Sequence, residues 1–145
     1  MTRLPITPRM TYSQMRYAAD SLPVTITSRV LPENICGLYD AETNLILIDP
    51  RMTYAQKRST LVHELVHWAH GDTGCNPLSS GKEEARARRE TARILIDREQ
   101  YAEAEVLYDG DAYAIACDLD VTVQTVQDYK TLLRGCRPYP FSLKS

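Results

Sequence analysis

The spacing of apolar residues at the start of the chain predicts a short helix preceded by an arm. Residues 1–10 contain two prolines and show no apolar period. Thr11 and Gln14 then have the spacing of a helix capping box, in which each side chain bonds to the backbone of the other residue. The apolar series that follows ends before Pro23, so we expect the helix to lie between these points.

From Val24 the pattern changes from helical spacing to alternation. Apolar and polar residues alternate over most of 24–30, which predicts a half-buried strand. Two further short runs, Cys36–Asp40 and Leu45–Asp49, flank a polar turn and predict a hairpin that Pro50 ends. We therefore expect a small antiparallel sheet.

The remaining chain predicts helices separated by short breaks. A second capping box, Thr53 with Gln56, begins a long apolar helical segment, and Gly71 is placed to end it. A third box, Ser80 with Glu83, begins the next helix after a polar loop. The helices that follow the loop are expected over about 80–97, 98–107, 112–118 and 123–134.

The last two predicted helices, joined by a short turn, have the rhythm of a helix-turn-helix. A DNA-reading helix is expected to carry Arg, Lys, Asn or Gln in a basic surrounding. This segment sets amide and basic side chains against an equal number of carboxylates: Gln124, Gln127 and Lys130 against Asp118, Asp120 and Asp128. This balance of charges does not attract the phosphate groups of DNA. We therefore favour a helical subdomain that packs on the rest of the protein or docks a protein.

Composition limits the class of protein further. The chain has 145 residues with 17 basic and 19 acidic side chains, so its net charge of −2 favours neither nucleic acid nor an anionic membrane. It has no apolar run of about 18 residues, and Met1–Pro8 lacks the apolar centre of a signal peptide. Its four cysteines form no C-x-x-C pair, which indicates reduced thiols. We expect a cytoplasmic protein.

The long apolar helix contains an H-E-x-x-H sequence formed by His63, Glu64 and His67. Residues four apart lie about 40° from each other around a helix, so the two imidazoles can bind one Zn²⁺. Glu64 then points to one side of the metal, where it can hold a water molecule.

Catalytic zinc sites add a third protein ligand. His70 lies seven residues beyond His63, about 10 Å along the helix, which is too far for one ion to reach both. Glu84 lies near the middle of the apolar face of the next predicted helix, where a carboxylate needs a partner. That partner is either the metal or Arg88, one turn later, in an ordinary i, i+4 ion pair.

With these motifs, the chain resembles the ImmA/IrrE family of metallopeptidases, in particular the short forms found in actinobacteria and their phages. The resemblance covers about residues 24–97 and rests on His63-Glu64-Leu65-Val66-His67, Gly71-Asp72 and Glu84-x-x-Ala87-x-x-x-Thr91-Ala92-x-x-Leu95-Ile96. It implies a zincin-like α+β fold and Glu84 as the third zinc ligand. The family often has Asp or Asn at the position of Arg88, so this cation either weakens metal binding or holds the substrate or the transition state.

These observations predict four parts of the chain. They are an arm (1–10), a zinc metallopeptidase core (11–108), a helix-turn-helix-like helical subdomain (109–135) and a tail (136–145). In the core, Glu64 is expected to act as general base. Four side chains are candidates for stabilising the oxyanion: Tyr39, Tyr54, His70 and Arg88.

The resemblance also implies a class of substrate, since such enzymes cleave or inactivate helix-turn-helix repressors of phages or mobile elements. The expected setting is then the bacterial cytoplasm. Two alternatives remain at this point. The first is a non-catalytic regulator that keeps zinc for folding and binds a repressor, and the second is a DNA-binding regulator that acts through the last two helices.

Overall fold

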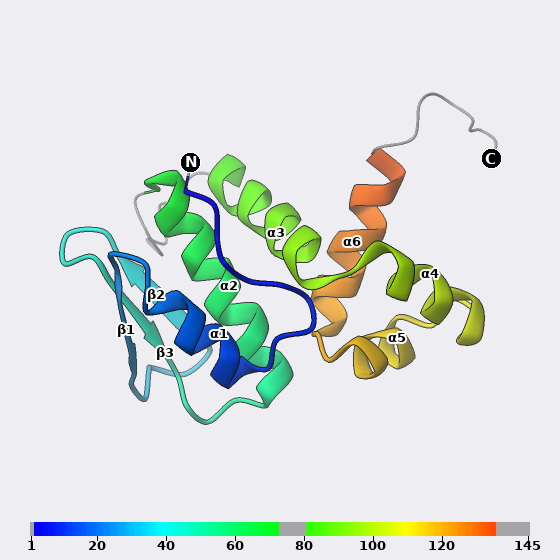
Figure 1. The fold of residues 1–145 in the computed structure, drawn as a ribbon, viewed down its shortest axis with the longest axis horizontal. Helices are drawn as coiled ribbons and strands as arrows, with labels where there is room; N and C mark the ends of the chain where they lie inside the picture. The colour runs from blue at the N-terminus through cyan, green and yellow to red at the C-terminus, as the bar shows by residue number, and fades with distance from the viewer. Residues whose placement is uncertain (1, 73–80, 136–145) are drawn as a thin grey trace.

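Helix α2 (Tyr54–His70) lies at the centre of the molecule, with the sheet and α1 on one side and α3 on the other (Figure 1). The structure is a computed structural model that describes residues 2–72 and 81–135. Within these residues the elements are α1 (Tyr12–Ala19), β1 (Thr25–Ser28), β2 (Gly37–Asp40), β3 (Leu45–Ile48), α2, α3 (Gly81–Leu95), α4 (Arg98–Leu107), α5 (Ala112–Leu119) and α6 (Val123–Gly135). The protein is therefore α+β, as predicted, with three strands and six helices in the described residues.

The sheet is mixed, so the prediction of an antiparallel sheet is wrong for one of its strands. The predicted hairpin forms, with β2 antiparallel to β3, but β1 pairs with β3 in parallel and the strand order is β1-β3-β2. Alternation fixes the face of a strand and not its direction. The direction follows from the connection over residues 29–36, which carries the chain past the position of β3. The Asp49 carboxylate holds this connection by accepting a hydrogen bond from the backbone N–H of Leu31 at 3.0 Å.

Both capping boxes that fall within the described residues form as predicted. Thr11 and Gln14 bond reciprocally at the start of α1, and Thr53 and Gln56 do so at the start of α2. Gly71 ends α2 in the left-handed region at φ 68°, a conformation that glycine adopts without steric cost. The third predicted box includes Ser80 and lies outside the described residues, as does the predicted tail from residue 136.

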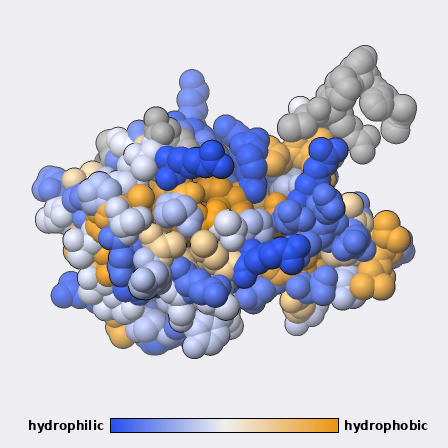
Figure 2. Space-filling view, viewed as in Figure 1, coloured by the Kyte–Doolittle hydropathy of each residue, from blue (hydrophilic) through white to orange (hydrophobic). Residues whose placement is uncertain are grey.

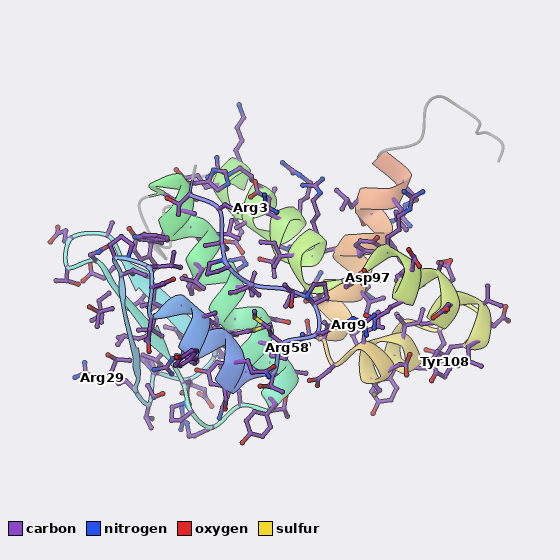
Figure 3. All side chains as sticks on the ribbon, in the orientation of Figure 1. Arg3, Arg9, Arg29, Arg58, Asp97 and Tyr108 are labelled. Carbon is purple, nitrogen blue, oxygen red and sulfur yellow. The ribbon has the colours of Figure 1, made fainter. Side chains whose placement is uncertain are left out.

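The N-terminal arm is docked on the helices through a buried arginine of α2. Arg58 is 2% exposed, and its guanidinium donates hydrogen bonds to the carbonyl oxygens of Pro8 at 2.6 Å and Met10 at 3.0 Å. It also donates to the carbonyl oxygen of Asp120 in the turn between α5 and α6. Figure 3 shows Arg58 beside the arm, close to Arg9. One side chain therefore joins three segments that are far apart in the sequence.

Helices α4, α5 and α6 extend the core beyond α3 (Figure 1). Ile115, Val121 and Val126 are buried in the same apolar cluster as Leu61 and Leu65 of α2. The two helices and the turn between them lie where the sequence predicts them. Their assignment as a helix-turn-helix, and the boundary at residue 109, stay predictions.

The exposed surface in the described stretches mixes polar and apolar side chains (Figure 2). Figure 2 shows mixed polar and apolar surface, with apolar side chains over the end of α4, where Val106 and Leu107 are 84% and 71% exposed. No helix in the two described stretches has both the length and the apolar character that crossing a membrane requires.

Candidate metal and active site

The structure brings His63, His67 and Glu84 together, although Glu84 comes from a different helix. Nε2 of His63 lies 3.1 Å from Oε2 of Glu84, and Nε2 of His67 lies 3.3 Å from Oε1. Two donors that each bind a tetrahedral zinc ion at about 2.0–2.2 Å are about 3.4 Å apart. The donor atoms therefore fit around one small ion, and all of them lie within 4.8 Å of one another. No other group of three His, Cys, Asp or Glu side chains in the described residues is close enough to do so. His63, His67 and Glu84 form the candidate metal-binding group.

Glu84 lies on the predicted face of α3 but is less buried than the sequence suggested. Ala87, Thr91, Ala92 and Leu95 are buried as expected, whereas the Glu84 side chain is 48% exposed. The difference arises because the first turn of α3 borders a cleft rather than the packed core. Hydrogen bonds from His63 and His67 hold the pKa of Glu84 well below its ordinary value, so this carboxylate is an anion.

His67 is oriented by a buried carboxylate that sequence analysis did not assign a role. Its Nδ1 lies 2.8 Å from Oδ2 of Asp72, and the two side chains are 1% and 5% exposed. Because Nδ1–H donates to the carboxylate of Asp72, Nε2 is the ring nitrogen that faces Glu84 and is available to a metal ion once its proton is displaced. Arg86 of α3 donates to the other oxygen of Asp72. Helices α2 and α3 are thus also joined by the contacts of Asp72 with His67 and with Arg86.

The raised pKa of His67 follows from the same contacts. Burial opposes the charged ring, but hydrogen bonds with Glu84 and Asp72 outweigh it and raise the pKa of His67 to about 9. In the metal-free protein this histidine is therefore protonated near neutral pH. A metal ion must displace that proton to bind.

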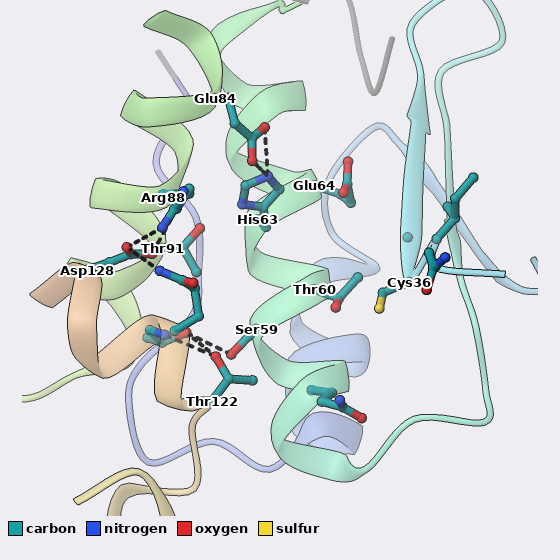
Figure 4. Close-up of a pocket in the computed structure, with 16 residues that line it drawn as sticks. Cys36, Ser59, Thr60, His63, Glu64, Glu84, Arg88, Thr91, Thr122 and Asp128 are labelled. Carbon is teal, nitrogen blue, oxygen red and sulfur yellow. Dashed lines mark hydrogen bonds and ion pairs between the residues drawn. The ribbon is translucent and has the colours of Figure 1, made fainter. Parts of the chain in front are cut away.

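Glu64 lies on the cleft side of α2, beside the metal-binding group (Figure 4). It is 4% exposed overall and lines the cleft together with His63 and Glu84. Strand β2 approaches α2 closely at this point because residue 37 is a glycine. A Cβ atom there would collide with Cγ2 of Thr60 and lie 3.4 Å from Cγ of Glu64. Gly37 is thus a second residue that sequence analysis missed.

The cleft has a volume of about 570 Å³, within the range of small-molecule and substrate sites. One wall is formed by the connection before β2, with Ile35 and Cys36, and the opposite wall by α6, with Gln124 and Asp128. Among the described residues, Cys36 and Cys117 are free cysteines, and both are exposed. The helical segment after residue 109 therefore contributes directly to the cleft that contains the metal-binding group.

Arg88 forms its ion pair across this cleft wall and not with Glu84. Nη2 lies 2.8 Å from Oδ1 of Asp128, and Nε donates to Oδ2 at 3.1 Å (Figure 4). The ordinary i, i+4 pair that competed with metal binding for Glu84 is thus not the pair that forms. Asp128 could not be linked to Arg88 from the sequence, because forty residues separate them.

Of the four oxyanion candidates, Arg88 is the one that lines the cleft. Tyr39 is buried in β2, and Tyr54 is 67% exposed at the start of α2. His70 pairs with Glu90 of α3 at 2.9 Å. Among these four side chains, Arg88 is therefore the one placed to contact a substrate bound in the cleft.

In this α+β fold, two histidines of one helix and a carboxylate of another could hold a metal ion, and Glu64 lies beside them in a cleft. Metal-dependent hydrolases have such an arrangement. Comparison with protein families makes the class specific. Residues 19–128 match Peptidase M78, the IrrE N-terminal-like domain, and the chain belongs to this family. The resemblance inferred from the motifs is thereby confirmed, and the match extends it through α4 and α5 into α6. No curated protein matches the chain.

Proposed function

We propose that the protein is a zinc-dependent endopeptidase. The observation that carries the proposal is the meeting of His63, His67 and Glu84 at donor separations of 3.1 to 3.3 Å. Two imidazole nitrogens and one carboxylate oxygen are a standard catalytic zinc set. When bound there, zinc supplies a Lewis acid that polarises a carbonyl oxygen and lowers the pKa of water toward neutrality.

Glu64 acts as the general base. It is the carboxylate of the cleft that lies one residue from a ligand without belonging to the metal-binding group. It takes the proton of the attacking water and passes it to the leaving amine. His67 is held in one tautomer by Asp72, and Gly37 allows β2 to come close enough to form the wall beside Glu64.

The substrate that we propose is a helix-turn-helix repressor of a phage or mobile element, cleaved in the bacterial cytoplasm. The family resemblance supports this proposal. The cleft is consistent with it, because Thr122, Gln124 and Thr125 line its α6 side and carry polar groups that can hydrogen-bond to a peptide backbone.

The test uses the repressor encoded beside this protein. Wild-type protein is incubated with it in the presence of zinc, in parallel with the Glu64→Gln variant, and fragments are identified by mass spectrometry. We expect cleavage by wild type alone. If both proteins leave the repressor equally intact, the proteolytic proposal is wrong. If both inactivate it equally without cleavage, the non-catalytic regulator is correct instead.

The zinc site is tested separately by metal content. Purified wild type is expected to hold one zinc ion, and Glu84→Ala is expected to lose most of it during dialysis. Equal retention by both proteins would exclude Glu84 as a ligand. The DNA-binding alternative predicts an affinity for duplex DNA that falls steeply with salt. It is less favoured because Gln124 and Asp128 of α6 line the cleft.

A further inference from the structure

We propose that Arg88 is a specificity residue that binds a carboxylate group of the substrate next to the metal site. The inference rests on the proposed function, since it assigns one subsite of the same cleft. The carboxylate belongs either to an acidic side chain close to the scissile bond or to the C-terminus of the substrate. Both present the same planar group to a guanidinium.

The position of Arg88 is the first observation. It lies one turn after the ligand Glu84 on α3, about 6 Å further along the helix axis, and it lines the same cleft as His63 and Glu64. Figure 4 shows its guanidinium on the α6 side of the metal-binding group. A peptide bound with its scissile bond at the metal must therefore pass Arg88 when it runs toward α6.

The second observation is the way in which Asp128 holds the guanidinium. The carboxylate accepts two hydrogen bonds, from Nε and from Nη2, so the pair does not use Nη1. The side chain of Arg88 is 44% exposed and that of Asp128 is 16% exposed. Gln124 also donates to Oδ1 of Asp128 at 2.9 Å, which disperses the negative charge. The pair thus presents its positive end to the cleft in a fixed orientation.

The third observation is the charge balance of the cleft. Zinc would neutralise the carboxylates of Glu64 and Glu84, and Asp128 is paired and mostly covered. Arg88 is the one guanidinium or ammonium group among the described residues that line the cleft. A substrate carboxylate therefore finds a single complementary cation there. Because Asp128 already restricts the rotamers of Arg88, little further conformational entropy is lost on binding.

The experiment measures binding, so it does not depend on turnover. Peptide hydroxamates are prepared in pairs that differ in one group: Glu against Gln at successive positions, and a free C-terminal carboxylate against its amide. Their dissociation constants for the zinc-loaded full chain are measured by calorimetry. Wild type is expected to prefer one acidic probe over its neutral partner by about tenfold, the size of one hydrogen bond to a charged group. The pair that shows the preference identifies which source of carboxylate Arg88 binds.

Variants connect the preference to Arg88. Arg88→Gln is expected to abolish it while leaving the neutral probe bound as in wild type, and Arg88→Lys is expected to retain part of it. Asp128→Asn, which frees the guanidinium, is expected to reduce it. Arg89→Gln is the matched control, because Arg89 is the neighbouring exposed arginine of α3 and does not line the cleft.

Three results would overturn the inference. Equal affinities of wild type for every pair of probes would exclude a carboxylate subsite while leaving the zinc site intact. Equal weakening of acidic and neutral probes by Arg88→Gln would place Arg88 at the metal-bound group, as an oxyanion donor. Failure of every hydroxamate to bind would instead overturn the proposed zinc site, and the inference with it.

Discussion

The contact between Asp72 and His67 predicts that a residue outside the ligand set controls metal affinity. Oδ2 of Asp72 lies 2.8 Å from Nδ1 of His67, and both side chains are almost fully buried. The substitution Asp72→Asn keeps an oxygen that can accept the Nδ1–H bond, so the tautomer of His67 is preserved. The substitution removes the negative charge that makes the imidazole of His67 a stronger metal ligand. It also replaces the oxygen that accepts from Arg86 by an NH2 group, which cannot accept that hydrogen bond.

The expected size of this effect follows from the burial of the pair. Loss of a carboxylate that supports a metal-binding histidine lowers metal affinity about 10–100-fold, or about 1.4–2.7 kcal/mol. We expect the upper part of this range, because water cannot replace the lost charge at a site that is 1% and 5% exposed. Zinc affinity is measured by competition with a chromophoric chelator at fixed pH.

The matched control is Glu90→Gln. Glu90 of α3 contacts His70 of α2 at 2.9 Å, which is another histidine–carboxylate pair three residues further along α2, but His70 does not belong to the metal-binding group. This variant is expected to bind zinc as wild type does. The reasoning is refuted if Asp72→Asn binds zinc with unchanged affinity, or if Glu90→Gln weakens zinc binding to the same extent.

Three further predictions concern pH and stability. In EDTA, the melting temperature is expected to fall as pH rises from 6.5 toward 9. Folding raises the pKa of His67 from 6.5 to about 9, so its protonation stabilises the folded protein fully below pH 6.5 and no longer does so above pH 9. A flat profile would contradict this. Gly37→Ala is expected to cost about 1–3 kcal/mol in denaturant unfolding, because its Cβ meets Thr60 and the strand must move; a stability equal to wild type would show that β2 has room. Arg58→Met is expected to cost about 3 kcal/mol, because it leaves buried carbonyl groups unpaired, whereas the exposed Arg29→Met should change the melting temperature little.

Features encoded by neighbouring residues were predicted well. The capping boxes at Thr11 and Thr53 each require residues three apart, and Gly71 ends its helix by a local conformational preference. The central position of Glu84 on the face of α3 follows from helical periodicity, which selected it from the surrounding carboxylates. Local chemistry therefore determined the elements and pointed to the residues of the metal-binding group.

Features that depend on contacts between distant segments were not predicted. Alternation over 24–30 could not give the parallel pairing of β1, because strand direction is decided by the path of the connection. The partner of Arg88 is a carboxylate forty residues away, and many sequence positions offered such a group. The contact of Asp72 with His67 was easier to predict, because Asp72 follows the end of the helix directly and lies five residues from His67.

The buried guanidinium of Arg58 also has a consequence for folding during synthesis on the ribosome. Its acceptors come from Pro8 and Met10, which are synthesised early, and from the turn at Asp120, which is synthesised late. Until that turn has emerged, the guanidinium of Arg58, in the second turn of α2, lacks one of its hydrogen-bond acceptors and remains solvated. The helix that carries Glu64 can therefore reach its final environment only after the turn at Asp120 has been synthesised. An enzyme assembled in this order has no finished cleft while its own nascent chain is still unfolded beside it.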